Sequence, residues 1–176
     1  DVTGVDPASR TVKAADRIYP YDFLILAAGS TSTFFGVPGA ETYALPLKTI
    51  EQAIALRNRI LACFERAAQE EDPQMRRRLL TFVIVGGGAT GIEFAGALAE
   101  LIRGPLTKDF PALDCSEVRG ELLEAQGSLL PGLPERLRAY ALSRLHRIGV
   151  LVRLNATVSE VTSREVRFFL NFAIPT

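Results

Sequence analysis

The middle of the chain alternates short apolar runs with segments of helical spacing. Strands are predicted over Leu79–Val85, Val118–Leu123 and Val150–Leu154, because each run is short and bounded by charged or turn residues. A glycine turn and a helix follow the first strand, and a helix from about Pro134 to Ile148 precedes the third. Two strands joined through a helix run in the same direction, so this order predicts an α/β fold with a parallel sheet.

Shorter segments with turn residues between them lie on both sides of this region. Val2–Val5, Arg10–Lys13 and Arg17–Tyr19 have the spacing of a small antiparallel meander. Val158–Val161 and Val166–Phe169 are also short. We expect them to form a second antiparallel excursion from the parallel sheet.

The region between the meander and the first helix suggests a domain boundary. Tyr21–Ser30 is nearly continuously apolar and ends in small residues, which is typical of a strand buried on both faces. The loop from Gly36 to Pro46 is rich in Gly and Pro and reads as a crossing between domains. We therefore predict domains at 1–45 and 46–176. Asp1 begins inside a strand pattern without a methionine, and Phe168–Thr176 stops just after an apolar segment, so we expect an internal fragment.

A long helix is predicted from Ile50 to about Glu71. Thr49 can cap its first turn and Gln52 can reach back to the cap amide. Asp72-Pro73 should end it, and Arg76–Arg78 should be a solvated run leading into the next strand. The expected inner face is Ile50, Ala53, Ile54, Ile60, Leu61 and Phe64.

The strongest local signal is Gly86-Gly87-Gly88-Ala89-Thr90-Gly91, which follows a predicted strand and opens a helix. In this context Gly86 permits a tight turn, Gly88 lets the backbone approach a pyrophosphate, and Gly91 permits close packing of helix on strand. Free amides and the helix dipole would hold the pyrophosphate. Ordinary helix packing would explain nearby alanines but not three glycines at this spacing.

Glu124 is the candidate acid for the adenosine ribose hydroxyls. It ends the second strand and lies 33 residues after Gly91, later than the roughly 20 usual for this motif, so we predict a surface insertion at Gly104–Gly120. Ala125-Gln126 follows without an arginine for a 2'-phosphate, which favours NAD(H) over NADP(H). The alternative is that Glu124 merely ends a strand in solvent.

Glu93 lies in the first turns of the same helix. It could position a nicotinamide or a proton, or it could simply be an acid favoured near a helix N-terminus. His146 reads as structural, no metal site is expected, and Cys63 and Cys115 are assigned no chemistry.

Composition narrows the classes of partner. Twenty basic residues balance twenty acidic ones, so no global field favours nucleic acid or an anionic membrane. No apolar run approaches the roughly 20 residues that cross a bilayer, and no signal-peptide pattern is present. Two cysteines without a paired redox motif suit a reducing cytoplasm.

Two segments, Val85–Glu93 and Ala97–Leu101, resemble the NADH-binding region of type II NADH dehydrogenases, the single-subunit NADH:quinone oxidoreductases. The similarity covers nearly the whole chain. Further similar segments are Tyr21–Ser30, Leu47-Lys48-Thr49, Lys108–Asp114, Glu124-Ala125, Leu129-Leu130-Pro131 and Gly149-Val150.

The resemblance implies an NADH domain, here 46–176, inserted into an FAD domain to which 1–45 would contribute. Hydride would pass from NADH to FAD and electrons on to a quinone, with the cofactors carrying the redox chemistry. Glu93 would lie near nicotinamide and flavin as the candidate catalytic residue. The implied NADH-binding residues are Gly86, Gly87, Gly88, Ala89, Thr90, Gly91, Glu93, Glu124 and Ala125, and Ala28, Gly29 and Ser30 would approach FAD.

The family's N-terminal FAD phosphate loop, second flavin-binding stretch and membrane-docking end have no counterpart in this sequence. We expect the chain alone to be inactive and not to hold FAD stably. For the full-length protein the resemblance implies a place at the cytoplasmic face of the membrane and allows a homodimer. Two alternatives stay open: another FAD-dependent NAD(P)H reductase of ferredoxin-, rubredoxin- or nitrite-reductase type, and a non-catalytic NADH-binding module.

Overall fold

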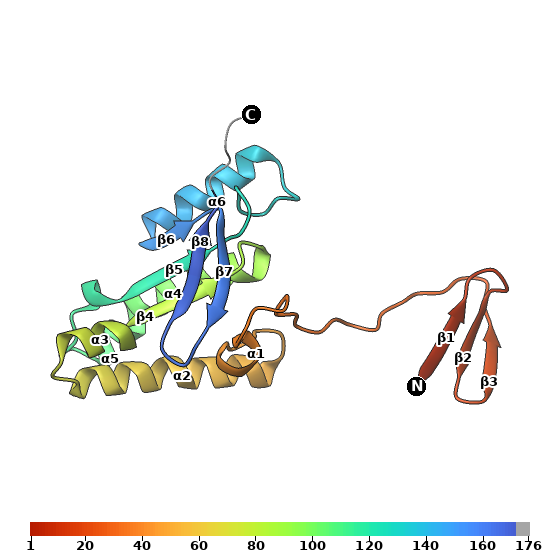
Figure 1. Cartoon of the computed structure of the whole chain (residues 1–176), viewed down its shortest axis with the longest axis horizontal. Helices are drawn as coiled ribbons and strands as arrows, with labels where there is room; N and C mark the ends of the chain where they lie inside the picture. Colours follow the sequence, from red (N-terminus) through yellow and green to blue (C-terminus); the bar gives the residue numbers. More distant parts are fainter. Residues whose placement is uncertain (172–176) are drawn as a thin grey trace. The chain divides into compact units, whose positions relative to one another are not determined.

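The computed structural model of the protein describes residues 1–171. The chain forms two compact units, Asp1–Thr31 and a larger unit that begins at Ser32 (Figure 1). The predicted domains at 1–45 and 46–176 were defined by the nucleotide that each would bind, and they stay a prediction. Within residues 1–171, no helix combines the length and the apolar character that a membrane crossing requires.

The first unit contains the predicted antiparallel meander. Its strands are β1 (Val2–Asp6), β2 (Thr11–Ala14) and β3 (Arg17–Pro20), in the order β1-β2-β3. In the first turn the Asp6 carboxylate accepts hydrogen bonds from the Ser9 hydroxyl and backbone amide, which lower the pKa of Asp6. The meander prediction is confirmed.

The strand predicted over Tyr21–Ser30 is wrong. This segment has no regular secondary structure, and the side chains of Phe23 and Ile25 are 94% and 89% exposed. A strand is stabilised by hydrogen bonds to a neighbouring strand. No strand within the described residues pairs with this segment, so its apolar pattern alone does not make it a strand.

The second unit is built around a parallel sheet of β4 (Thr81–Val85), β5 (Arg119–Leu123) and β6 (Val150–Arg153), in that order. All three strands pair in parallel. Helices α4 (Ala89–Leu101) and α6 (Glu135–Arg147) make the crossovers (Figure 1). The predicted α/β fold with a parallel sheet is confirmed.

The main core lies between this sheet and its helices. Strand residues Ile84, Leu122 and Val150 pack there with Leu98 of α4 and Leu145 of α6, and none is more than 8% exposed. Successive side chains of a strand point to opposite faces, so Arg153 of β6 faces away from this core.

A two-stranded hairpin, β7 (Ala156–Val161) and β8 (Val166–Leu170), adds the predicted antiparallel excursion. The Arg153 guanidinium lies 5.6 Å from the ring centroid of Phe168 on β8. Because Arg153 points away from the helices, the hairpin lies on the other face of the sheet, where β7 contacts β5. Residues 172–176, the end of the predicted Phe168–Thr176 segment, lie outside the described residues.

Helix α2 (Ile50–Gln69) begins with the predicted capping box. The Thr49 hydroxyl accepts from the Gln52 amide at 3.3 Å, and Gln52 Oε1 accepts from the Thr49 amide at 3.2 Å. In its second half Phe64 is fully buried and lies 6.1 Å, centroid to centroid, from the Phe82 ring of β4.

The predicted inner face of α2 is wrong in its first half, where Ile50, Ala53 and Ile54 are exposed. Twenty helical residues extend about 30 Å, whereas five strand residues extend about 17 Å. The helix is therefore longer than the sheet on which it packs, and its core face is shifted to Ile60, Phe64 and Ala67.

Further helical turns appear where loops were predicted. Helix α3 (Pro73–Leu79) contains the arginine run and is capped by Asp72, whose Oδ1 accepts from the Gln74 amide at 2.9 Å. Arg76 is not simply solvated, because its Nε lies 3.1 Å from Glu117 Oε2. Short helix α1 (Ala40–Tyr43) lies within the Gly36–Pro46 loop.

The predicted surface insertion at Gly104–Gly120 is also wrong. Helix α4 continues into a π-helical turn (Ile102–Leu106) and α5 (Thr107–Asp109), and a 3-10 turn (Cys115–Glu117) precedes β5. Leu106 and Leu113 are 1% and 8% exposed and belong to the core. Hydrophobic residues in this segment therefore anchor it to the sheet.

Candidate dinucleotide site

The glycine motif forms a tight turn between β4, which ends at Val85, and α4, which begins at Ala89. Gly86 has a φ of +108°, a conformation that side chains disfavour. Its amide donates to the Leu123 carbonyl of β5 at 2.8 Å. The turn thus lies at the carboxyl edge of the parallel sheet, where nucleotides bind in such folds.

Gly91 and Gly88 differ in what surrounds them. A Cβ atom at Gly91 would overlap the Gly86 carbonyl oxygen, so the absence of a side chain lets the helix pack on the turn. A Cβ at Gly88 would meet no atom within 4 Å, so this position borders open space. Gly91 therefore serves packing, whereas Gly88 leaves room for a ligand.

The N-terminus of α4 offers amides to that space. No side chain caps the helix, and the amide of Ile92 donates to the Gly88 carbonyl at 3.1 Å, as the first regular bond of the helix. The amides before Ile92 have no intrahelical acceptor, as at every helix start. The positive end of the helix dipole lies in the same place. This arrangement fits a phosphate group.

Glu124 follows β5 and reaches the glycine turn. Its Oε2 accepts from the Gly87 amide at 2.6 Å, and its Oε1 accepts from the Gln126 amide at 2.7 Å. An ionised carboxylate has about four acceptor positions, so these two bonds orient the group and leave capacity for hydroxyl donors. Glu124 is half-buried against the turn and does not merely end a strand in solvent.

Leu129 and Leu130 support the same turn, although sequence analysis did not place them in the site. The Leu130 amide donates to the Gly87 carbonyl at 3.0 Å, and a Cβ at Gly87 would lie 2.6 Å from Leu129 Cδ2. Leu129 is 2% exposed. Two leucines in a loop carry no local signal for such a role, since only the tertiary fold brings them to the turn.

The remaining predicted residues fall into two groups. Ala89, Thr90, Glu93 and Ala125 are all exposed around the turn and along α4. Residues Ala28–Ser30 belong to the first unit, where they are exposed and irregular. The structure thus brings together the residues predicted for NADH, while Ala28–Ser30 alone form no flavin pocket.

Several known proteins are similar to this chain. The profile of the family described as pyridine nucleotide-disulphide oxidoreductase matches residues 1–172. A type II NADH:quinone oxidoreductase of Mycobacterium tuberculosis is 42% identical over 165 residues, which are 92% of this chain and 36% of that protein. A probable NADH dehydrogenase of Dictyostelium discoideum is 37% identical over 91% of this chain and 37% of its own length.

A solved structure of NDH2 from Plasmodium falciparum in complex with NADH matches 93% of this chain and 34% of its own chain, with a TM-score of 0.75 and 22% identity. That likeness supports the fold alone. The chain spans about a third of the length of the curated relatives named above. The match of the family profile over residues 1–172 establishes that the chain belongs to the pyridine nucleotide-disulphide oxidoreductase family.

Proposed function

We propose that this chain is the NADH-binding part of a flavin-dependent NADH dehydrogenase that passes electrons to a quinone. The observation that carries the proposal is the glycine turn, with an open position at Gly88 and the Glu124 carboxylate fixed beside it. Similarity to NADH:quinone oxidoreductases over most of the chain supports the same function.

Each residue of the turn has a role in this proposal, and Gly86 and Gly87 form the bend that borders the cofactor. Amides of Gly88, Ala89, Thr90 and Gly91 bind the pyrophosphate, which requires no lysine. The Glu124 carboxylate accepts from the adenosine ribose hydroxyls, and its charge disfavours a 2'-phosphate. NADH supplies the hydride, and the protein binds and orients it.

Glu93 is the proposed residue near the nicotinamide half. It lies about one helical turn beyond the start of α4 and is exposed, so it can reach a group that extends from the pyrophosphate along this edge. Ala125 follows Glu124 and would border the adenosine. Both roles depend on the orientation of NADH that the turn imposes.

The FAD, quinone and membrane parts of the proposal rest on the relatives. Ala28, Gly29 and Ser30 would approach FAD in the assembled enzyme, with 1–45 contributing to the FAD domain and 46–176 forming the NADH domain. A quinone would be the acceptor, and the full-length protein would associate peripherally with the cytoplasmic face of a membrane, as a homodimer. The chain by itself would be inactive because it does not hold the flavin.

Titration with NADH and NADPH tests the proposal. Calorimetry on the 176-residue chain should give micromolar binding of NADH and weaker binding of NADPH. Gly88→Val should abolish binding, because its side chain would enter the space beside the α4 amides. Gly4→Val is the matched control, since Gly4 also borders open space but lies in β1. A folded chain that binds neither nucleotide would overturn the proposal.

A further inference from the structure

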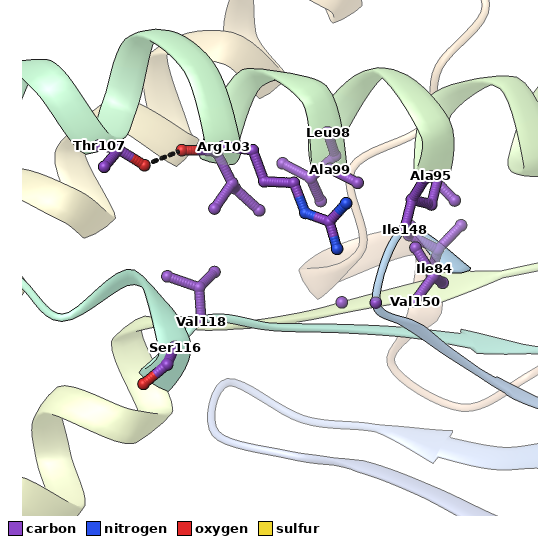
Figure 2. A pocket seen from close by; sticks show the side chains of 13 residues that line it. Ile84, Ala95, Leu98, Ala99, Arg103, Thr107, Ser116, Val118, Ile148 and Val150 are labelled. Atoms are coloured by element: carbon purple, nitrogen blue, oxygen red, sulfur yellow. Dashed lines mark hydrogen bonds between the residues drawn. The ribbon is translucent and has the colours of Figure 1, made fainter. Parts of the chain in front are cut away.

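A cavity of about 400 Å³ lies within the larger unit between α4 and the sheet, and no residue of the glycine turn lines it (Figure 2). It is lined by Gly120 and Val150, which belong to the amino-terminal ends of β5 and β6. The glycine turn follows the carboxyl end of β4. Because the strands are parallel, Gly120 and Val150 line the cavity at the edge of the sheet opposite the glycine turn, and Ile84 of β4 lines its other end.

The cavity walls are mostly apolar. The apolar lining residues come from α4, the π-helical turn, strands β4 and β6, and the residues just before β5 and just after α6: Ile84, Ala95, Leu98, Ala99, Ile102, Val118, Ile148 and Val150. Thr107 and Ser116 add two hydroxyl groups to the lining. Gly120 and Gly149 leave part of the boundary without side chains. A volume of this size falls in the range of roughly 300–1,000 Å³ that small-molecule sites occupy.

One cationic group borders this apolar space: Arg103, an exposed residue whose charge lies at the open side of the cavity. Figure 2 shows the Arg103 side chain extending from the helix into the gap above β5 and β6. Its Nη2 would lie 3.1 Å from a Cβ built on Gly149, so the guanidinium lies over that glycine. No acid is among the cavity's lining residues, and no ion pair of Arg103 occurs within residues 1–171.

The polar groups at the same end do not neutralise Arg103. Asp114 accepts from the Ser116 amide at 2.8 Å and does not line the cavity. The Thr107 hydroxyl donates to the Ile102 carbonyl at 2.7 Å. The cavity therefore combines mostly apolar walls and two hydroxyl groups with a single positive charge at its exposed side.

The helix backbone is irregular next to the cavity. Ile102–Leu106 form a π-helical turn with Pro105 inside it, and such turns are rare and frequently occur at functional sites. Ile102 and Arg103 belong to the turn, and Thr107 follows it directly. The π-helical turn thus contains Arg103, which supplies the positive charge, and Ile102, which forms part of the cavity wall.

We propose that this cavity binds a small monoanion with an apolar tail, such as a medium-chain carboxylate. The tail would replace water along the aliphatic walls, and the head would accept charge-assisted hydrogen bonds from Arg103. The proposal is independent of NADH, because no residue of the glycine turn lines the cavity.

Octanoate is the probe, and calorimetry or NMR titration of the 176-residue chain is the measurement. Octanoate should bind, octanol should bind more weakly and octylamine should not bind. Arg103→Gln should weaken octanoate roughly tenfold or more, since a hydrogen bond to a charged group is lost. Arg147→Gln is the matched control, because Arg147 is exposed in the last turn of α6 and does not line the cavity.

A second variant separates loss of the site from loss of the fold. Ala99→Leu adds volume on the cavity wall and should abolish octanoate binding while the circular dichroism spectrum stays unchanged. Failure of the folded wild-type chain to bind octanoate would overturn the proposal. Equal binding by wild type and Arg103→Gln, or equal binding of octanol and octanoate, would also overturn it, because the site would then recognise no anion.

Discussion

At the scale of single residues, two glycines of α4 should respond in opposite ways to alanine. Gly91→Ala would bring a Cβ into the Gly86 carbonyl, so the turn or helix must move, and we expect a loss of about 1–3 kcal/mol in the free energy of unfolding. Gly96→Ala would meet no atom within 4 Å, and should stabilise the helix by up to about 1 kcal/mol. Urea denaturation measures both. Equal effects of the two substitutions would contradict the packing role of Gly91.

Glu124→Gln tests the charge beside the turn. The amide oxygen can still accept from the Gly87 amide, so the bond to the turn should persist, whereas the bond from the Gln126 amide and the negative charge that disfavours a 2'-phosphate are lost. We expect the ratio of NADPH to NADH affinity to rise roughly tenfold. Glu100→Gln removes the same charge from an exposed position near the end of α4 and should leave the ratio unchanged. An unchanged ratio in both variants would place Glu124 away from the ribose.

Much of the candidate site was predictable residue by residue because its chemistry is local. Three glycines between a strand and a helix require a special backbone, and an acid at the next strand end falls at the same edge of a parallel sheet. Leu129, Leu130 and Arg103 were not predictable, since each acts through contacts with residues far away in the chain. Their sequence environment is that of an ordinary loop or helix.

At the scale of elements, α2 provides a matched pair of isoleucines. Ile60 is 4% exposed in the core, whereas Ile54 is 45% exposed in the half of the helix that extends past the sheet. Ile60→Ala should cost about 2–5 kcal/mol of unfolding free energy, and Ile54→Ala should lie within about 0.5 kcal/mol of wild type. Thermal or urea unfolding would reveal the difference. A large loss for Ile54→Ala would mean that the first half of α2 is buried.

Sequence periodicity predicted most elements because each strand or helix has its own pattern of polar and apolar positions. It failed where the formation or burial of an element depends on a neighbouring element. The Tyr21–Ser30 run has the composition of a central strand but no paired neighbour within the described residues. The first half of α2 has helical spacing of apolar residues, yet the short strands do not extend far enough to cover it.

At the scale of the whole molecule, the two units carry different parts of the proposed function. The glycine turn, Glu124 and the Arg103 cavity all belong to the unit that begins at Ser32, whereas Ala28–Ser30 belong to the first unit. If NADH recognition needs only the larger unit, removal of the first unit should leave NADH binding unchanged. Flavin binding, in contrast, requires elements beyond Ala28–Ser30.

Limited proteolysis tests this division. Chymotrypsin, which cleaves after aromatic residues and leucine, should cut first at Phe23, Leu26 or Phe35, because these side chains are 94%, 75% and 88% exposed in backbone without regular structure. Phe64 is fully buried and serves as an internal control of the same residue type. Mass spectrometry should find one stable product that begins between Leu24 and Gly36, and calorimetry should find its NADH affinity within about twofold of the intact chain. If that product stays folded but no longer binds NADH, the first unit takes part in nucleotide recognition and the glycine turn is insufficient.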